Sequence, residues 1–487
     1  MAFDLPNIHV DGLSAIIKQW APAAASKEVK PEDFGITDPT TNTTTLLPNL
    51  GTETITLKNI FIRYDDASSA MKTKFDIKNL SSNIESIDLN KEVVKLKEVV
   101  LDQSDSYVLF DKITQKKEPD TSSSSVNWIV SVDKIAVDKT NFTFKDDNQA
   151  RMPGFDYGNI GIKDLAGAMR GIYYSADSIS GSVQNLTAKD RSGLYLKQFK
   201  GDFVYGNNGA IIENLLVQTP KTTIRDYIKI TYPSLDAVSK YPQLVQVDAR
   251  IRKSQIDMSD IKYFAPDLEQ MDVMKPLMTR SFYIDGRVVG RLDDLNIPYI
   301  EFKTLDKTHV IASAKIKGLP DTDKLHIDLN LKKLTTGKVD LDRLVAKSLL
   351  PEGMEFEYPN SISLAGTFNG GMSGFNANMK LMTEKGNASM NGFLNMAQRD
   401  TTYDAQVSID NFNLGHILKQ DSVLGIISAD AQIKGRGLNP KTMDADVKGT
   451  INRFDAMGYG YNNINLDLMA IESRCFGAVL QVSSRHT

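Results

Sequence analysis

Apolar and polar residues alternate along most of this chain, and the alternation restricts the possible folds more than any other feature. In residues 403–410 the apolar positions are Tyr403, Ala405, Val407 and Ile409, and every residue between them is polar. Successive side chains of a β-strand point to opposite faces, so a period of two predicts one dry face and one hydrated face. The sequence therefore predicts a sheet whose apolar face must be covered by something.

The links between the predicted strands are short, which favours a mainly β, antiparallel fold. Residues 206–209, Gly-Asn-Asn-Gly, are typical of a hairpin turn. Open sheets of more than about ten strands tend to curl or split, so two arrangements stay open. Either successive sandwiches close over the apolar face, or one sheet curls into a trough with an apolar interior.

Glycines on the predicted apolar face bear on that choice, because glycine in a strand marks sharp curvature or the close approach of another group. They are consistent with bending that closes a small sandwich and with a curled sheet that keeps interior space. These glycines are Gly286, Gly290, Gly366, Gly392, Gly435 and Gly449.

A few segments depart from the alternation. Around Asn59 the pattern of residues 54–64 slips phase, as a bulge or a tight strand break would cause. Elsewhere helical spacing and proline positions predict short helices. These helices are expected at Leu13–Trp20, at Met258–Met274 with a break at Pro266, at Leu341–Leu350 before Pro351, and at Leu414–Lys419.

The bulk composition is that of a folded protein without a nucleic-acid partner. Of the 487 residues, 41% are hydrophobic and 24% are charged, and 57 basic against 61 acidic residues give a net charge of −4. Cys475 is the single cysteine, so no intrachain disulfide can form. No segment reaches the roughly 18 apolar residues of a membrane-spanning helix.

Catalytic chemistry is not indicated, and we expect no enzyme, no cofactor and no metal. The five histidines lack metal-ligand spacing, and His326 falls on the polar face of a predicted strand. Asp444 and Asp446 form an i, i+2 carboxylate pair, which we interpret as part of a hydrated face. Phosphate loops, nucleophile elbows and zinc motifs are missing from the sequence.

Several sequence segments within residues 245–470 resemble those of a known protein family. They are Gln255–Pro266, Gly318–Pro320, Asp410–Leu418, Leu424–Gly437, Thr442–Met443, Gly458–Tyr459 and Tyr461–Ile464. Together they resemble the TamB family of translocation and assembly modules of diderm bacteria, which is related to AsmA-like proteins and more remotely to chorein-type bridge lipid transporters. The resemblance covers about half of the chain well and is weaker over residues 50–240.

The resemblance implies a long, strongly curved antiparallel β-sheet that forms an elongated, taco-like groove with a few short helices. It divides the chain into residues 1–50, a poorly patterned segment with a short helix and a linker; 51–240, an AsmA-like groove segment; 241–470, a TamB-like groove segment; and 471–487, an atypical and possibly truncated end. Such a protein lies in the periplasm. It is anchored to the inner membrane by an N-terminal helix that this chain lacks, and it meets an outer-membrane barrel protein of the Omp85 type.

The function implied is outer-membrane biogenesis, in which the groove conducts phospholipid acyl chains between the inner and outer membranes. The lining residues expected from the alternation are Ile284, Val288, Ala312, Ile316, Ile327, Leu329, Leu364, Met379, Val407, Ile409, Ala431, Ile433, Val447, Ile451, Leu466 and Leu468. One alternative is an assembly factor for outer-membrane or secreted β-barrel proteins that acts by strand addition. A second alternative is a structural surface protein of stacked β-sandwiches.

Overall fold

Strands make up most of the protein, whose structure is a computed structural model. It describes residues 2–4, 6–20, 49–51, 53–113, 127–270, 274–345, 356–396, 401–437, 443–471 and 474–476. The chain divides into two compact units. The first comprises Met1–Tyr227 with Asp260–Pro266, and the second comprises Ile228–Ser259 with Asp267–Thr487.

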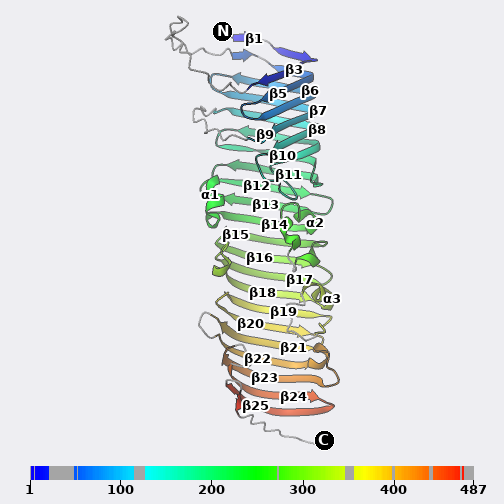
Figure 1. Cartoon of the computed structure of the whole chain (residues 1–487), viewed down its shortest axis with the longest axis vertical. Coiled ribbons are helices and arrows are strands. Elements are labelled where there is room, and N and C mark those ends of the chain that lie inside the picture. Colours follow the sequence, from blue (N-terminus) through cyan, green and yellow to red (C-terminus); the bar gives the residue numbers. More distant parts are fainter. Residues whose placement is uncertain are drawn as a thin grey trace. The chain divides into compact units, whose positions relative to one another are not determined.

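Unit 1 contains a sheet in which the strands follow one another side by side (Figure 1). Most neighbours are antiparallel, but β2 and β3 pair in parallel with β5, and β7 pairs in parallel with β8. A separate parallel pair is formed by β1 (Ala2–Asp4) and β4 (Asn49–Gly51). The sheet strands are β2 (Asn7–Asp11), β3 (Ser14–Gln19), β5 (Thr54–Asp66), β6 (Met71–Asp88), β7 (Val93–Phe110), β8 (Ile129–Asp146), β9 (Gly161–Tyr174), β10 (Ser178–Asp190), β11 (Tyr195–Gly206) and β12 (Gly209–Gln218).

Unit 2 contains a sheet in which the strands from β14 to β26 pair as antiparallel neighbours in chain order. The boundary between the units falls within β13 (Thr223–Thr231). The strands of unit 2 are β14 (Gln246–Asp257), β15 (Ser281–Arg291), β16 (Asp294–Thr304), β17 (Thr308–Lys317), β18 (His326–Thr336), β19 (Ile362–Gly371), β20 (Gly374–Thr383), β21 (Gly386–Asn395), β22 (Thr402–Asn413), β23 (Leu424–Arg436), β24 (Asp444–Ala456), β25 (Tyr459–Ile471) and β26 (Arg474–Phe476).

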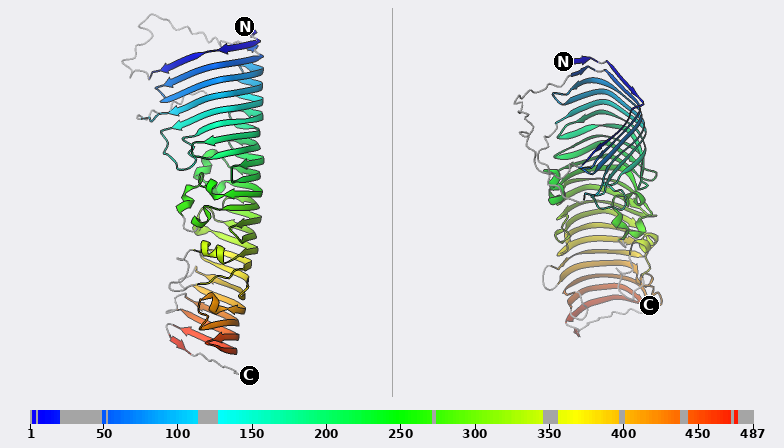
Figure 2. Two further views of the ribbon diagram at one scale, coloured as in Figure 1. Left: turned by 90° about the vertical axis from the view of Figure 1, so that its right-hand side faces the viewer. Right: turned by 45° about the horizontal axis from the view of Figure 1, so that its top comes forward.

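Helices are few and short, and those of unit 2 lie along one side of its sheet (Figure 2, left). They are α1 (Leu235–Lys240), η2 (Pro242–Leu244), α2 (Met258–Ile261), η3 (Pro266–Gln270), η4 (Lys275–Leu277), η5 (Thr322–Lys324), α3 (Lys338–Leu344) and α4 (Leu414–Ile417). The expected helix over 414–419 is confirmed as α4, in which the Asn413 side chain accepts a hydrogen bond from the His416 amide at 3.0 Å. The expected break at Pro266 is also confirmed, because α2 ends before it and η3 begins at it.

Two helix predictions need correction. Residues 14–19 form β3, which pairs with residues 61–66 of β5, so the expected helix over 13–20 is wrong. Hydrogen bonds to a neighbouring strand here override the weak helical spacing. The helix expected over 341–350 begins three residues earlier, at Lys338, and ends at Leu344; residues 346–350 lie outside the described part.

A line of left-handed residues bends the long strands of unit 1. Asn59 has φ 50°, Gln103 has φ 55° and Lys139 has φ 44°. The register on either side places these residues on one line across β5, β7 and β8. One left-handed residue reverses the alternation without ending the strand, which explains the phase slip predicted around Asn59.

The mainly β, largely antiparallel architecture with few short helices is therefore confirmed. The prediction that the sheet is strongly curved and taco-like is wrong. Among the described strands no pairing joins the first and last strands of either unit's sheet. Each sheet is neither closed nor strongly curled. In unit 1 the left-handed residues lie on one line, and on either side of it the strands continue as ordinary paired, extended backbone. The four residue ranges expected from the resemblance stay predictions.

Candidate functional site

The apolar residues of unit 2 line up across its sheet in rows, each row taking one residue from each successive strand. The row through Val407 is in register from β18 to β25 without interruption. Its members are Leu331, Gly366, Met379, Met390, Val407, Ala431, Gly449 and Leu466. The alternation of each strand thus adds up to one continuous surface, which we call the apolar face.

Two neighbouring rows run parallel to the Val407 row on the same face. One consists of Leu329, Phe368, Ala377, Gly392, Ala405, Ile433, Val447 and Leu468. The other consists of Leu334, Leu364, Leu381, Ala388, Ile409, Ala429, Ile451 and Ile464.

The remaining predicted lining residues join the same face upstream. Ala312 pairs with Leu331, and Ile316 pairs with Ile327. Ile284 continues the third row through Phe302 and Val310. Val288 lies two residues after Gly286, whose neighbours Ile300 and Ala312 lead into the Val407 row. The structure therefore brings all sixteen predicted residues together on one face.

This face is open over the described part of unit 2. Ala312 is 4% exposed and Leu468 is 36% exposed, and the other fourteen predicted residues are half-buried. The extensive contacts of each described strand are with the strands beside it, so no second described sheet packs on the face. Contiguous exposed apolar surface of this kind marks a binding surface in soluble proteins.

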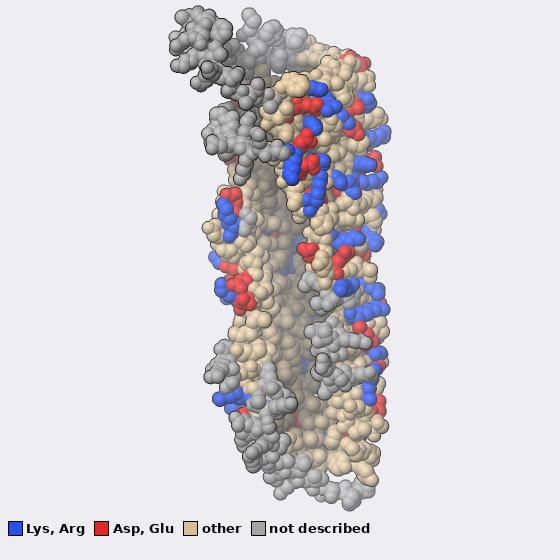
Figure 3. All heavy atoms as spheres, viewed as in Figure 1, with Lys and Arg blue, Asp and Glu red and all other residues tan. Residues whose placement is uncertain are grey.

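The space-filling view supports this description of unit 2. Figure 3 has the orientation of Figure 1, and the hollowed middle of the surface carries few charged atoms, whereas Lys, Arg, Asp and Glu gather towards the sides. A hollow without charge is suited to hydrocarbon and not to an ionic ligand.

Glycines within the rows are sites of close strand approach. A Cβ on Gly449 would lie 2.1 Å from the Asp430 carbonyl oxygen and 2.7 Å from the Ala431 Cα. On Gly366 it would lie 2.0 Å from the Asn378 carbonyl oxygen. At both positions the structure shows close approach of the neighbouring backbone, one of the two features that glycine in a strand marks.

We expect Gly449→Ala to destabilise unit 2 by about 1–3 kcal/mol, the usual cost of overpacking. The matched control is Gly460→Ala, because the nearest atom to a Cβ at Gly460 is Asp455 Oδ1 at an ordinary 3.6 Å. Thermal unfolding followed by circular dichroism measures both variants. Equal melting temperatures for the two variants would show that the tight contact at Gly449 is relaxed at no cost.

The opposite face of unit 2 is polar. Asn378, Asn391, Gln406, Gln432 and Lys448 form a row in register across β20 to β24. Two hollows lie on this polar face, and Gln406 and Gln432 line both. Most lining residues of the two hollows belong to the polar face, and Met390, Val407 and Ala431 of the Val407 row also border one of them.

Unit 1 also has an apolar face with rows in register. One row runs from β5 to β12 through Leu57, Leu80, Leu101, Val137, Gly167, Leu186, Phe199 and Val217. A second row includes small polar residues, since Ile55 pairs with the buried Ser82. Unit 1 can therefore offer the same kind of surface, with more polar positions in it.

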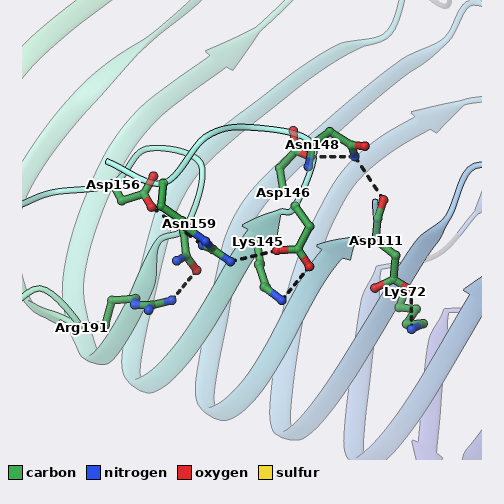
Figure 4. Close-up of polar contacts among 10 residues, drawn as sticks. Lys72, Asp111, Lys145, Asp146, Asn148, Asp156, Asn159 and Arg191 are labelled. Carbon is green, nitrogen blue, oxygen red and sulfur yellow. Dashed lines mark hydrogen bonds and ion pairs between the residues drawn. The ribbon is translucent and has the colours of Figure 1, made fainter. Parts of the chain in front are cut away.

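A network of charged residues lies at the strand ends of unit 1 (Figure 4). Its contacts are Lys72 Nζ to Asp111 Oδ2 at 2.5 Å, Lys145 Nζ to Asp147 Oδ2 at 2.7 Å, Arg151 Nη2 to Asp147 Oδ1 at 2.9 Å, Arg151 Nη1 to Asp156 Oδ2 at 3.8 Å, and Arg191 Nη1 to Asn159 Oδ1. The hydrogen bond from Lys145 lowers the pKa of Asp147 below its ordinary value. These groups pair acid with base and join the ends of β6, β7 and β8 to the loop after β8.

The candidate acid–base groups do not converge. His326 is exposed, as predicted, while His309 Nε2 lies 2.9 Å from Glu301 Oε1. Asp444 is exposed, and Asp446 is partly exposed and lies 3.1 Å from Lys448 Nζ, so the two carboxylates lie on a hydrated face, as predicted. Within the described residues, no group of three His, Cys, Asp or Glu side chains is placed to hold a metal ion. In the same residues no helix has both the length and the apolar character needed to cross a membrane.

Two features were not anticipated from the sequence. The helix α1 begins at a Ser234 N-cap, whose Oγ accepts a hydrogen bond from the Ala237 amide at 3.2 Å. The signal was present as Pro-Ser-Leu-Asp at residues 233–236, a serine cap followed by an acid in the first turn. The second feature is the row of amide side chains on the polar face, which becomes visible only when the register is known.

Comparison with known protein families, with curated proteins and with solved structures finds no match to this chain. The resemblance to TamB and AsmA-like proteins therefore stays a prediction.

Proposed function

We propose that this chain is a periplasmic segment of a TamB- or AsmA-like protein in outer-membrane biogenesis, and that its apolar face forms a shallow, open groove for phospholipid acyl chains. The observation that carries the proposal is the uninterrupted Val407 row, which is in register across eight strands and is half-buried or exposed at every member except the buried Leu331. A sandwich protein would bury such a row under a second sheet.

The mechanism follows from the nature of the face. An acyl chain lying along the rows removes its methylenes from water at about 0.8 kcal/mol each. Because successive strands offer similar side chains, this free energy changes little from one strand to the next, and the chain can slide. The headgroup stays in water at the side of the face. An energy source for directional movement would act elsewhere.

The proposal includes the membrane partners that the resemblance implies. These are the inner membrane, through an N-terminal anchor, and an outer-membrane barrel protein of the Omp85 type. A nucleic-acid partner is not proposed, because the net charge is −4 and acidic residues outnumber basic ones.

Photocrosslinking from the two faces of β22 tests the proposal. A benzophenone amino acid replaces Val407 in one variant and the adjacent Gln406 in the control, and both are expressed with export to the periplasm. We expect phospholipid adducts by mass spectrometry from position 407 and none from position 406, because successive side chains face opposite sides.

The other outcomes separate the alternatives. The same photocrosslinker placed on β2, β3 or β26 would give adducts to unfolded barrel proteins if the chain is the assembly factor that acts by strand addition. If neither position yields lipid, and native mass spectrometry of the purified chain finds no phospholipid, the conduit proposal is wrong.

A further inference from the structure

The polar face of unit 2 has a second surface with the properties of a binding site. A hollow of about 470 Å³ is lined by side chains of β19 to β23, and an adjoining hollow of about 450 Å³ shares several of them. The shared lining residues are Asn378, Asn391, Gln406 and Gln432. We call this surface the amide furrow. Most of its lining residues belong to the face opposite the proposed lipid groove, while Met390, Val407 and Ala431 of the Val407 row also border the hollow of about 450 Å³.

The amide furrow is rich in uncommitted hydrogen-bonding groups. Gln432 Nε2 donates to Asp404 Oδ1 at 3.0 Å. Within the described part of the chain, by contrast, no side-chain hydrogen bond engages Asn376, Asn378, Asn391 or Gln406, and all four side chains are exposed. Each amide offers one carbonyl acceptor and two N–H donors. The surface is thus equipped for a ligand that both donates and accepts hydrogen bonds.

An exposed aromatic ring accompanies these amides. Phe393 is 42% exposed and lines the same hollow. It stands between Asn376 of β20 and Asp404 of β22 in the register. A large apolar side chain on an otherwise polar strand face is costly to hydrate. Its position beside amides without side-chain partners suits it to contact a ligand that the amides hold. The slightly positive C–H groups of a ligand can stack on the electron-rich face of the ring.

We propose that the amide furrow binds a neutral polyhydroxylated chain, that is, an oligosaccharide or polysaccharide. Hydroxyl groups both donate and accept, as the amides require, and the C–H face of a sugar ring fits the exposed Phe393. Asn378, Asn391 and Gln406 carry no charge, and the two lysines and two aspartates that also line the hollows, Lys380, Lys448, Asp404 and Asp430, balance one another, which favours a neutral ligand. Because adjacent strands are about 4.8 Å apart, the row supplies one amide per strand along a ligand that runs across the sheet.

Saturation-transfer difference NMR on the full chain tests the proposal with three neutral probes: cellohexaose, maltohexaose and chitohexaose. We expect transfer to at least one of them. Phe393→Ala should then weaken its binding by about tenfold, on the scale of a lost stacking contact, while Phe393→Tyr keeps the ring and the binding. The control is Asn330→Ala, an exposed amide on the same face that lines neither hollow.

Circular dichroism establishes that each variant is folded. The proposal is overturned if none of the three hexasaccharides shows transfer. It is equally overturned if Phe393→Ala binds as well as the unaltered chain, if Asn330→Ala loses binding to the same extent, or if only an unfolded polypeptide binds through these residues.

Discussion

Replacing Val407 and Ala431 with aspartate is expected to stop lipid transfer while the sheet stays folded. The two residues are a directly opposed pair on β22 and β23 within the Val407 row. Both are half-buried, so the carboxylates can remain hydrated when the groove is empty. A sliding acyl chain would have to displace that water, and desolvating charged groups costs several kcal/mol. A barrier of about 4 kcal/mol slows passage about a thousandfold.

The matched control places the same charges on the other face. Asn391 and Gln406 are also a directly opposed cross-strand pair, but they lie on the polar face. Val407→Asp with Ala431→Asp is compared with Asn391→Asp with Gln406→Asp in a fluorescent phospholipid transfer assay between two vesicle populations. Only the first pair should lose transfer. Equal rates for both pairs, at equal melting temperatures, would mean that acyl chains do not travel along the Val407 row.

The sequence predicted which residues share a face because the period of two is a local property of the strand. Val407 and Ile433 were placed on one side by their own neighbours, and the register then joined them through Ala405 and Ala431. The register itself could not be derived, since it depends on hydrogen bonds between strands that alternate in the same way. For this reason the rows of amides opposite the apolar face went unnoticed.

Curvature and the strand β3 show the limit of the same reasoning. Glycines such as Gly449 were consistent with bending that closes a small sandwich and with a curled sheet, and the close approach of Gly449 to the Asp430 carbonyl oxygen appears only in the structure. In residues 14–19, Ile16 and Ile17 are adjacent, which is compatible with a short helix. Ile16 and Ile17 pair with Arg63 and Tyr64 of β5. This pairing joins residues far apart in the sequence, so it could not be predicted from the residues around Ile16 and Ile17 alone.

The second large effect is expected at Asp340, a carboxylate at the start of α3 that is 1% exposed. Asp340 accepts hydrogen bonds from the backbone amides of Asp306 at 3.1 Å and Lys307 at 2.8 Å, and from the Thr308 hydroxyl at 2.7 Å. It therefore holds α3 against the turn between β16 and β17. Asp340→Ala leaves these donors buried without an acceptor, and we expect a loss of about 3 kcal/mol in the free energy of unfolding.

Asp342→Ala is the control on the same helix. Asp342 lies 3.0 Å from Lys338 at the surface, with 46% of its side chain exposed, and removing such a pair costs at most about 1 kcal/mol. Urea unfolding of both variants measures the difference. If Asp340→Ala is no less stable than Asp342→Ala, the stability of the turn between β16 and β17 does not depend on the buried carboxylate of Asp340.

The pH dependence at Asp340 has a definite sign. Burial raises the pKa of Asp340, but the hydrogen bonds from the Thr308 hydroxyl and from the backbone amides of Lys307, Asp306 and Thr308 outweigh it, so the pKa is lowered in the folded protein. The unfolded chain, with an ordinary pKa of about 3.9, takes up the proton first as the pH falls. The stabilisation is therefore complete well above pH 4 and is lost as the pH falls through the lowered pKa of the folded protein.

The difference in the free energy of unfolding between the unaltered chain and Asp340→Asn should be constant at neutral pH and shrink below about pH 4. A difference that grows on acidification would mean that Asp340 is protonated in the folded state, so that its proton and not its charge holds the turn.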